Sequence, residues 1–192
     1  VGQTVEIGKK TGAELVASFG LGMNLVSMYD YPAKQAGFGT LGNPGGTIKL
    51  PKAGAQVTFV AAVHSSALNA VKPQPGQPSR IASGAPVGYV LEIDNGPTIY
   101  FTGDTDVTMD MALIDRLYDV DVMLVNTGDH FNMSPRRAAV AVDLVKPKKA
   151  VPMHFKTFAV LAQSAEPFRA ELKKLGLGDR FLEMQPGETR RF

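Results

Sequence analysis

The sequence contains no cysteine among its 192 residues. Disulfide bonds and cysteine-based zinc sites are therefore excluded, so a transition-metal site in this chain would have to use histidine and carboxylate ligands. No uninterrupted apolar run approaches the roughly 18 residues that a membrane-spanning helix needs, and Val1 does not open a signal peptide. We therefore expect a soluble, cytoplasmic protein with no membrane partner.

The chain also has little net charge, a formal +2, and its basic residues are scattered. The densest group, Lys146, Lys148 and Lys149, flanks a proline and is most simply the solvated end of a helix. This pattern gives no indication of nucleic-acid binding. The apolar fraction of 44% and the charged fraction of 20% are ordinary for a globular protein. The length predicts one domain over residues 1–192.

Three common catalytic motifs are missing as well. The sequence has no G-x-S-x-G elbow and no P-loop, and the pair Gly20 and Gly22 lacks the third glycine of a dinucleotide fingerprint. Ser65 and Ser66 follow His64 and could suggest a hydrolytic serine. Adjacent residues of a strand point to opposite faces, however, so we interpret these serines as structural or supporting.

The periodicity of apolar residues predicts alternating strands and helices in the second half of the chain. Helices are predicted over 4–12, 109–118, 134–147 and 166–175, and strands over 13–17, 47–50, 56–63, 88–93, 98–102, 121–125, 150–154 and 181–184. Between residues 20 and 46 the many glycines predict irregular structure with one or two helical turns. The Asn95-Gly96 pair between two β-type runs predicts a hairpin. We therefore expect an α/β (α+β) fold whose sheet is not purely parallel.

Three of the predicted strands are each followed by a potential metal ligand. His64 follows the run 57–63, Asp104 follows 98–102 and Gly103, and His154 follows 150–153. Imidazole and carboxylate groups suit zinc and similar divalent ions. The pattern predicts a metal site on the rim of the sheet.

Each of these residues also has an ordinary structural interpretation. A single histidine at a strand end is more often a hydrogen-bonded structural imidazole, and Asp104 alone could be a turn carboxylate. The combination favours a metal site, because all three histidines of the chain, including His130, follow strand-like runs. His130 and its neighbour Asp129 could support the ligands, face the substrate or anchor a loop.

Five segments carry a resemblance to a known family. The segments are Ala62–Ser66, Gly88–Glu92, Tyr100–Thr105, Gly128–Pro135 and Lys146–Phe155, and together they resemble the metallo-β-lactamase superfamily, in particular its metal-dependent hydrolase branch related to the ascorbate-phosphate lactonases. The resemblance implies an αββα sandwich with one or two divalent ions at the sheet edge, zinc first and manganese or iron as alternatives.

The same resemblance implies roles for individual residues. His64 corresponds to a ligand of a first metal, Asp104 to the carboxylate that bridges two metals, and His154 to a ligand of a second. Asp104 and His130 are the catalytic candidates. The residues from Lys72 to Arg80, with His130 and Lys156, are candidates for the substrate rim, because a long polar loop in a compact domain is usually functional or mobile.

One part of the family pattern is missing. The signature His-x-His-x-Asp-His is not found in this sequence, and residues 1–7 resemble the helix that follows it. We therefore expect a sandwich that lacks its N-terminal strands, a second chain or fragment that carries the missing motif, and an oligomeric assembly.

The function implied by the resemblance is hydrolysis of a small-molecule ester, lactone or phosphoester by a metal-bound hydroxide. The alternative is a non-catalytic binding or assembly subunit that keeps a relic of the metal site. Zinc sites normally use about three or four protein ligands per ion, so the residues of this chain alone cannot complete a site for two ions.

Overall fold

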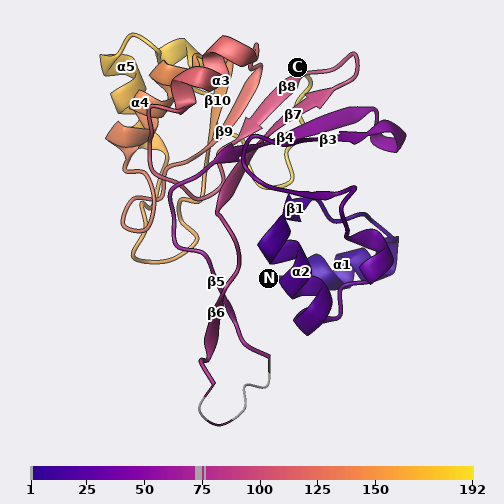
Figure 1. The fold of residues 1–192 in the computed structure, drawn as a ribbon. Helices are drawn as coiled ribbons and strands as arrows, with labels where there is room; N and C mark the ends of the chain where they lie inside the picture. Colours follow the sequence, from indigo (N-terminus) through magenta and orange to yellow (C-terminus); the bar gives the residue numbers. More distant parts are fainter. Residues whose placement is uncertain (1, 72–74, 76) are drawn as a thin grey trace.

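The computed structural model describes residues 2–71, 75 and 77–192, and its centre is a six-stranded sheet in the order β10-β9-β8-β7-β4-β3 (Figure 1). The strands are β3 (Thr47–Leu50), β4 (Ala55–Ala61), β7 (Val87–Ile93), β8 (Thr98–Phe101), β9 (Val122–Asn126) and β10 (Lys149–Met153). Strands β8, β9 and β10 are mutually parallel, whereas β3, β4, β7 and β8 pair antiparallel. The prediction of a mixed sheet is confirmed.

Helices provide the crossovers that parallel strands require. α3 (Met111–Leu117) joins β8 to β9, and α4 (Pro135–Val145) joins β9 to β10. α5 (Glu166–Lys174) lies beside α4, and Figure 1 shows all three helices gathered at the β8–β10 side of the sheet. The parallel half of the sheet therefore has its helices on one face.

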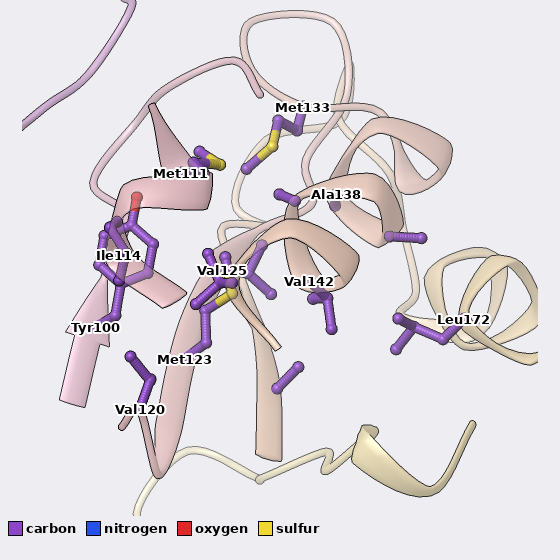
Figure 2. Packing of buried hydrophobic residues seen from close by; sticks show 14 of the residues in the cluster. Tyr100, Met111, Ile114, Val120, Met123, Val125, Met133, Ala138, Val142 and Leu172 are labelled. Carbon is purple, nitrogen blue, oxygen red and sulfur yellow. The ribbon is translucent and has the colours of Figure 1, made fainter. Parts of the chain in front are cut away.

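A single apolar cluster joins these helices to the strands beneath them (Figure 2). Its buried members are Val90, Tyr100, Met111, Ile114, Val120, Met123, Val125, Met133, Ala138, Ala139, Ala141, Val142, Val145, Ala150, Phe168 and Leu172. The buried residues of α4 include three alanines, Ala138, Ala139 and Ala141, and the helix packs against β9. Burial of each large side chain stabilises the fold by about 2 kcal/mol.

Local sequence signals fix both ends of α4. Ser134 has an extended backbone and its Oγ accepts a hydrogen bond from the Arg137 backbone N–H at 3.4 Å, and Pro135 occupies the first turn. At the other end Lys146 adopts a left-handed conformation with φ 50°. The predicted helix start at Ser134 is confirmed. The predicted hairpin is confirmed too, since Asn95 has φ 56° and β7 pairs with β8 across it.

One carboxylate ties together the starts of the three parallel strands. Asp121 Oδ2 accepts a hydrogen bond from the Thr98 backbone N–H at 2.8 Å, at the start of β8. Asp121 Oδ1 accepts another from Lys148 Nζ at 2.6 Å, beside the start of β10. The bond from Lys148, and then that from Thr98, lower the pKa of Asp121 below its ordinary value.

Replacing Asp121 with asparagine is expected to reduce the free energy of unfolding by about 1 kcal/mol at pH 7, because the Thr98 N–H and Lys148 lose an ionised acceptor. The pKa of Asp121 is lower in the folded state, so its stabilisation is present above the unfolded value of about 3.9 and is lost as the pH falls through the folded value. Urea unfolding from pH 3 to pH 7 measures the difference. The exposed Asp143→Asn serves as control, and a difference that is as large at pH 3 as at pH 7 would contradict the assignment.

The N-terminal part forms a second, smaller cluster. It contains α1 (Thr4–Thr11), α2 (Phe19–Tyr29) and the parallel pair β1 (Ala17–Ser18) and β2 (Leu41–Gly42). The 3-10 turn Ala33–Gln35 belongs to this region, whereas a second one, Pro51–Ala53, joins β3 to β4. Its buried apolar residues are Leu15, Ala17, Leu25, Tyr31, Ala36 and Leu41.

Two predictions for this region are wrong. The segment predicted to be irregular contains the 11-residue helix α2. A Cβ at Gly22 would collide with the Leu41 side chain, so this glycine serves helix packing and not a turn. The predicted strand 13–17 is reduced to its last residue, Ala17, in β1, because β1 pairs only with the two-residue β2.

One further prediction is corrected by the tertiary structure. The predicted strand 181–184 is only an isolated bridge between Phe181 and Ala150, since the Phe181 ring packs on Phe168 and the chain then leaves the sheet edge. The predicted polar loop 72–80 falls partly on residues outside the described ranges, and only Arg80 at its end belongs to a strand. β5 (Ala67–Asn69) and β6 (Arg80–Ala82) form an antiparallel arm that projects from the sheet in Figure 1.

The α/β expectation is confirmed by this architecture of a helix layer on a mixed sheet. A sandwich contains two stacked sheets. The described residues form one six-stranded sheet, and their other two sheets have two strands each. No helix in the described part of the chain has both the length and the apolar character to cross a membrane.

Candidate metal centre

The parallel order of β8, β9 and β10 brings two of the predicted ligands together. Asp104 follows β8, His154 follows β10, and β9 lies between these strands. The carboxyl ends of parallel strands meet at one edge of the sheet. The Asp104 Oδ2 and His154 Nε2 atoms lie 3.3 Å apart, with 40% and 26% of the two side chains exposed.

The orientation of His154 is fixed by a backbone feature and one hydroxyl. His154 has φ 57°, which turns the chain sharply as β10 ends. Its Nδ1 lies 2.9 Å from Thr157 Oγ1, so a hydrogen bond there leaves Nε2 directed at Asp104.

These two donors fit a divalent metal ion. An imidazole nitrogen and a carboxylate oxygen are ordinary zinc ligands at about 2.0–2.2 Å from the ion, and two ligands at tetrahedral angles are then about 3.3–3.5 Å apart. The 3.3 Å separation of Asp104 Oδ2 and His154 Nε2 agrees with that spacing. Two ligands remain fewer than the three or four of a complete zinc site.

The loop that carries Asp104 is built around Gly103. Gly103 has φ 63°, and a Cβ at this position would lie 2.6 Å from the carbonyl oxygen of Val87. Only glycine meets both conditions without strain. Thr105, the residue after Asp104, is buried, and its backbone carbonyl accepts a hydrogen bond from Asn126 Nδ2 at 2.9 Å. The end of β9 thus supports the Asp104 loop.

The segment that carries His64 lies beside this loop. The Val63 backbone N–H donates to Thr105 Oγ1 at 2.8 Å, and the Asp106 N–H donates to the Val63 carbonyl at 3.2 Å. His64 Nδ1 lies 2.9 Å from the Ser65 carbonyl oxygen. Within the residues that the structure describes, no group of three or more His, Asp or Glu side chains forms that could hold a metal. The role of His64 as a third ligand remains a prediction.

His130 lies in the loop between β9 and α4. Asp129 and His130 have φ 61° and 46°, and the Asp129 carboxylate accepts a hydrogen bond from the His130 backbone N–H. The His130 ring packs edge-on against Phe131, with centroids 4.4 Å apart. The structure places His130 on an exposed turn, and its catalytic role remains a prediction.

Ser66, two residues after His64, makes a structural contact, as expected. Ser66 Oγ lies 2.7 Å from Ser83 Oγ, a contact that joins the two strands of the β5–β6 arm at its base. Of the rim candidates, Lys156 is exposed and has φ 60°. Residues 72–74 and 76 of the predicted rim lie outside the described residues.

Sequence reasoning missed three residues that support the two donors. Thr157 orients His154, Asn126 supports the Asp104 loop, and Arg137 forms an ion pair with Asp106. Asn126 left a signal, because a polar side chain directly after the apolar run 122–125 must find a partner when buried. Thr157 and Arg137 left none, because their partners are set by the tertiary structure.

Comparison with known proteins identifies the family. A family model described as "Beta-lactamase superfamily domain" matches residues 9–155. The chain belongs to the beta-lactamase superfamily. The matched range includes His64, Asp104, His130 and His154, whereas Thr157 lies outside it.

Relatives in the superfamily carry a common name. A "UPF0173 metal-dependent hydrolase" of Thermodesulfovibrio yellowstonii is 45% identical over 190 residues, which cover 98% of this chain and 70% of the relative. A protein of the same name from Anaeromyxobacter sp. strain K is 49% identical over 176 residues, covering 90% of this chain and 61% of the relative. The chain thus spans between about three fifths and seven tenths of the length of these relatives.

A solved superfamily structure supports the fold assignment. Igni18, described as a novel metallo hydrolase from Ignicoccus hospitalis, superposes with a TM-score of 0.78 at 28% identity and covers all of this chain and 73% of that one. The metallo-β-lactamase fold class expected from the sequence is confirmed.

Proposed function

We propose that this chain supplies part of the active centre of a metal-dependent hydrolase that acts on a small ester, lactone or phosphoester. The observation that carries the proposal is the 3.3 Å approach of Asp104 Oδ2 to His154 Nε2 at the edge of the parallel strands. The relatives are named metal-dependent hydrolases, and these names support the same reaction class.

Asp104 and His154 would hold the ion, with His64 as a further ligand. Zinc suits this donor set, and manganese or iron are the alternatives. When bound, a divalent ion lowers the pKa of a coordinated water toward about 7 and polarises the substrate oxygen. The chain's own contribution is to fix the donors: Thr157 holds the His154 ring, and Gly103 and Thr105 set the Asp104 loop.

Substrate selection is assigned to the exposed loops around the two donors. His130 and Lys156 offer hydrogen-bond donors and positive charge for a carboxylate or phosphoryl group of the substrate. The arm formed by β5 and β6 carries Arg80 at its outer end. These residues are candidates for binding, whereas Asp104 is the candidate for the reaction itself, with His130 as second catalytic candidate.

The remaining ligands would come from a segment or second chain that carries His-x-His-x-Asp-His. We propose that the active form is such an assembly and that it acts in the cytoplasm. The absence of a three-residue ligand group within the described part of the chain also gives weight to a second function, a binding or assembly subunit with a relic metal site.

Intact mass, metal content and hydrolysis test the proposal on protein purified from its native source. We expect about one or two divalent ions per assembly and turnover of a p-nitrophenyl ester, a γ-lactone or bis(p-nitrophenyl) phosphate. Chelation should reduce the rate at least about 100-fold, and added Zn²⁺ or Mn²⁺ should restore it. Protein that contains no metal and has the same rate before and after chelation would refute the hydrolase and favour the binding subunit.

A further inference from the structure

Two hydrogen bonds join the residue before His64 to the two residues after Asp104. Val63, the residue before His64, donates to Thr105 Oγ1 and accepts from the Asp106 N–H. Thr105 and Asp106 are the two residues after Asp104. Two hydrogen bonds therefore make the His64 segment and the Asp104 loop one unit, so whatever anchors Asp106 anchors both.

Asp106 is held by a bidentate ion pair. Arg137 Nε donates to Asp106 Oδ1 and Arg137 Nη2 to Asp106 Oδ2, both at 2.5 Å, while the Val107 N–H also donates to Oδ1 at 2.8 Å. The Arg137 guanidinium therefore contacts both oxygens of the Asp106 carboxylate. Parallel paired bonds fix orientation as well as distance.

No acidic residue in the first turn of α4 pairs with Arg137. Arg136 and Arg137 occupy the first turn of α4, and that turn has no acidic residue. Positive charge is unfavourable at a helix N-terminus because of the macrodipole. The charge of Arg137 is balanced by Asp106, a residue 31 positions earlier in the sequence.

The helix at the other end of this contact is a rigid anchor. Ala138, Ala139 and Val142 of α4 are buried in the main apolar cluster, and Figure 2 shows Ala138 and Val142 directed into the core. Rigid elements hold functional groups more precisely than loops do. The contact between Arg137 and Asp106 thus connects the loops of the candidate centre to a helix that is packed into the main apolar cluster.

We propose that Arg137 is a positioning residue that locks the joined His64 and Asp104 segments onto α4, so that their side chains are held in place before metal binds. The metal part of this inference rests on the proposed function. Arg137 does not touch the metal donors; it acts through Asp106. Removal of such supporting contacts typically costs 10- to 100-fold in metal affinity.

The test compares two exposed ion pairs, one at each end of α4. Arg137→Met removes the contact to Asp106. Lys146→Met removes the pair between Lys146 Nζ and Asp115 Oδ2, 2.6 Å apart and similarly exposed, at the opposite end of α4. Arg137→Lys keeps the charge but cannot donate two parallel bonds.

Hydrogen exchange in the metal-free protein is the first measurement. The Val63 and Asp106 amides donate the two hydrogen bonds that join the segments. We expect their exchange rates to rise at least about tenfold in Arg137→Met and to stay the same in Lys146→Met. This readout does not require a functional metal centre, so it tests the positioning role even if the hydrolase proposal fails. Equal exchange at these two amides in both variants would overturn the inference.

Metal affinity is the second measurement, made on the complete protein with Co²⁺ followed by its visible absorption. We expect 10- to 100-fold weaker binding in Arg137→Met, an intermediate loss in Arg137→Lys and less than a twofold change in Lys146→Met. A shift in the Co²⁺ spectrum of Arg137→Met would report altered ligand geometry. Affinities of Arg137→Met and Lys146→Met within twofold of each other would overturn the role in metal binding.

Discussion

Replacing His154 with alanine is expected to lower the affinity of the protein for Zn²⁺ by at least about 100-fold and to abolish chelator-sensitive hydrolysis. The substitution removes the imidazole whose Nε2 lies 3.3 Å from Asp104 Oδ2, and so one of the two donors that the structure brings together. Loss of a contact behind a ligand already costs about 10- to 100-fold, and loss of the ligand costs more. Competition with a chromophoric chelator measures the affinity.

The matched control leaves the imidazole in place and removes only its support. Thr157→Val eliminates the hydroxyl that lies 2.9 Å from His154 Nδ1. We expect about a tenfold loss of Zn²⁺ affinity in this variant, with hydrolysis reduced but measurable. If His154→Ala bound Zn²⁺ as tightly as the unsubstituted protein, the assignment of His154 as a ligand would be wrong.

Replacing Gly128 with alanine is expected to reduce the free energy of unfolding by about 3 kcal/mol and to weaken metal binding. A Cβ at this position would collide with the backbone carbonyl oxygen of His154 and lie 3.0 Å from Asn132 Oδ1. Backbone atoms cannot rotate away, so the chain at His154 must move, and overpacking of this kind costs about 1–3 kcal/mol or more. Urea unfolding and Zn²⁺ titration measure the two effects.

A second glycine provides the comparison for this substitution. A methyl group added at Gly37 would have no atom within 4 Å, and the backbone there is not left-handed, so Gly37→Ala should change stability by less than about 1 kcal/mol. Equal stability of the Gly128→Ala and Gly37→Ala proteins would show that the His154 turn adapts easily, contrary to the tight packing at this position.

Most of the secondary structure could be predicted because its signals are local. Ser134 and Pro135 mark a helix start, and Asn95-Gly96 marks a hairpin, through contacts among residues next to one another in sequence. The helix α2 was missed for the opposite reason. Its glycines weaken the local helical signal, and their value lies in the close approach of Gly22 to Leu41, which no local pattern reveals.

The sequence by itself determined which groups of the candidate centre are available and that they follow strands. The lack of cysteine limits a transition-metal site to histidine and carboxylate, and apolar runs that end at Asp104 and His154 place both at strand ends. These conclusions need only residue chemistry and the short-range rules of strands and turns.

Only the tertiary structure decided which of these groups meet. Asp104 and His154 approach because β8 and β10 are parallel and flank β9, an order set by the packing of α3 and α4 on the sheet. The same packing brings Arg137 to Asp106, although 31 residues separate them. Such contacts depend on the free energy of the whole folded core, so no segment of the sequence specifies them alone.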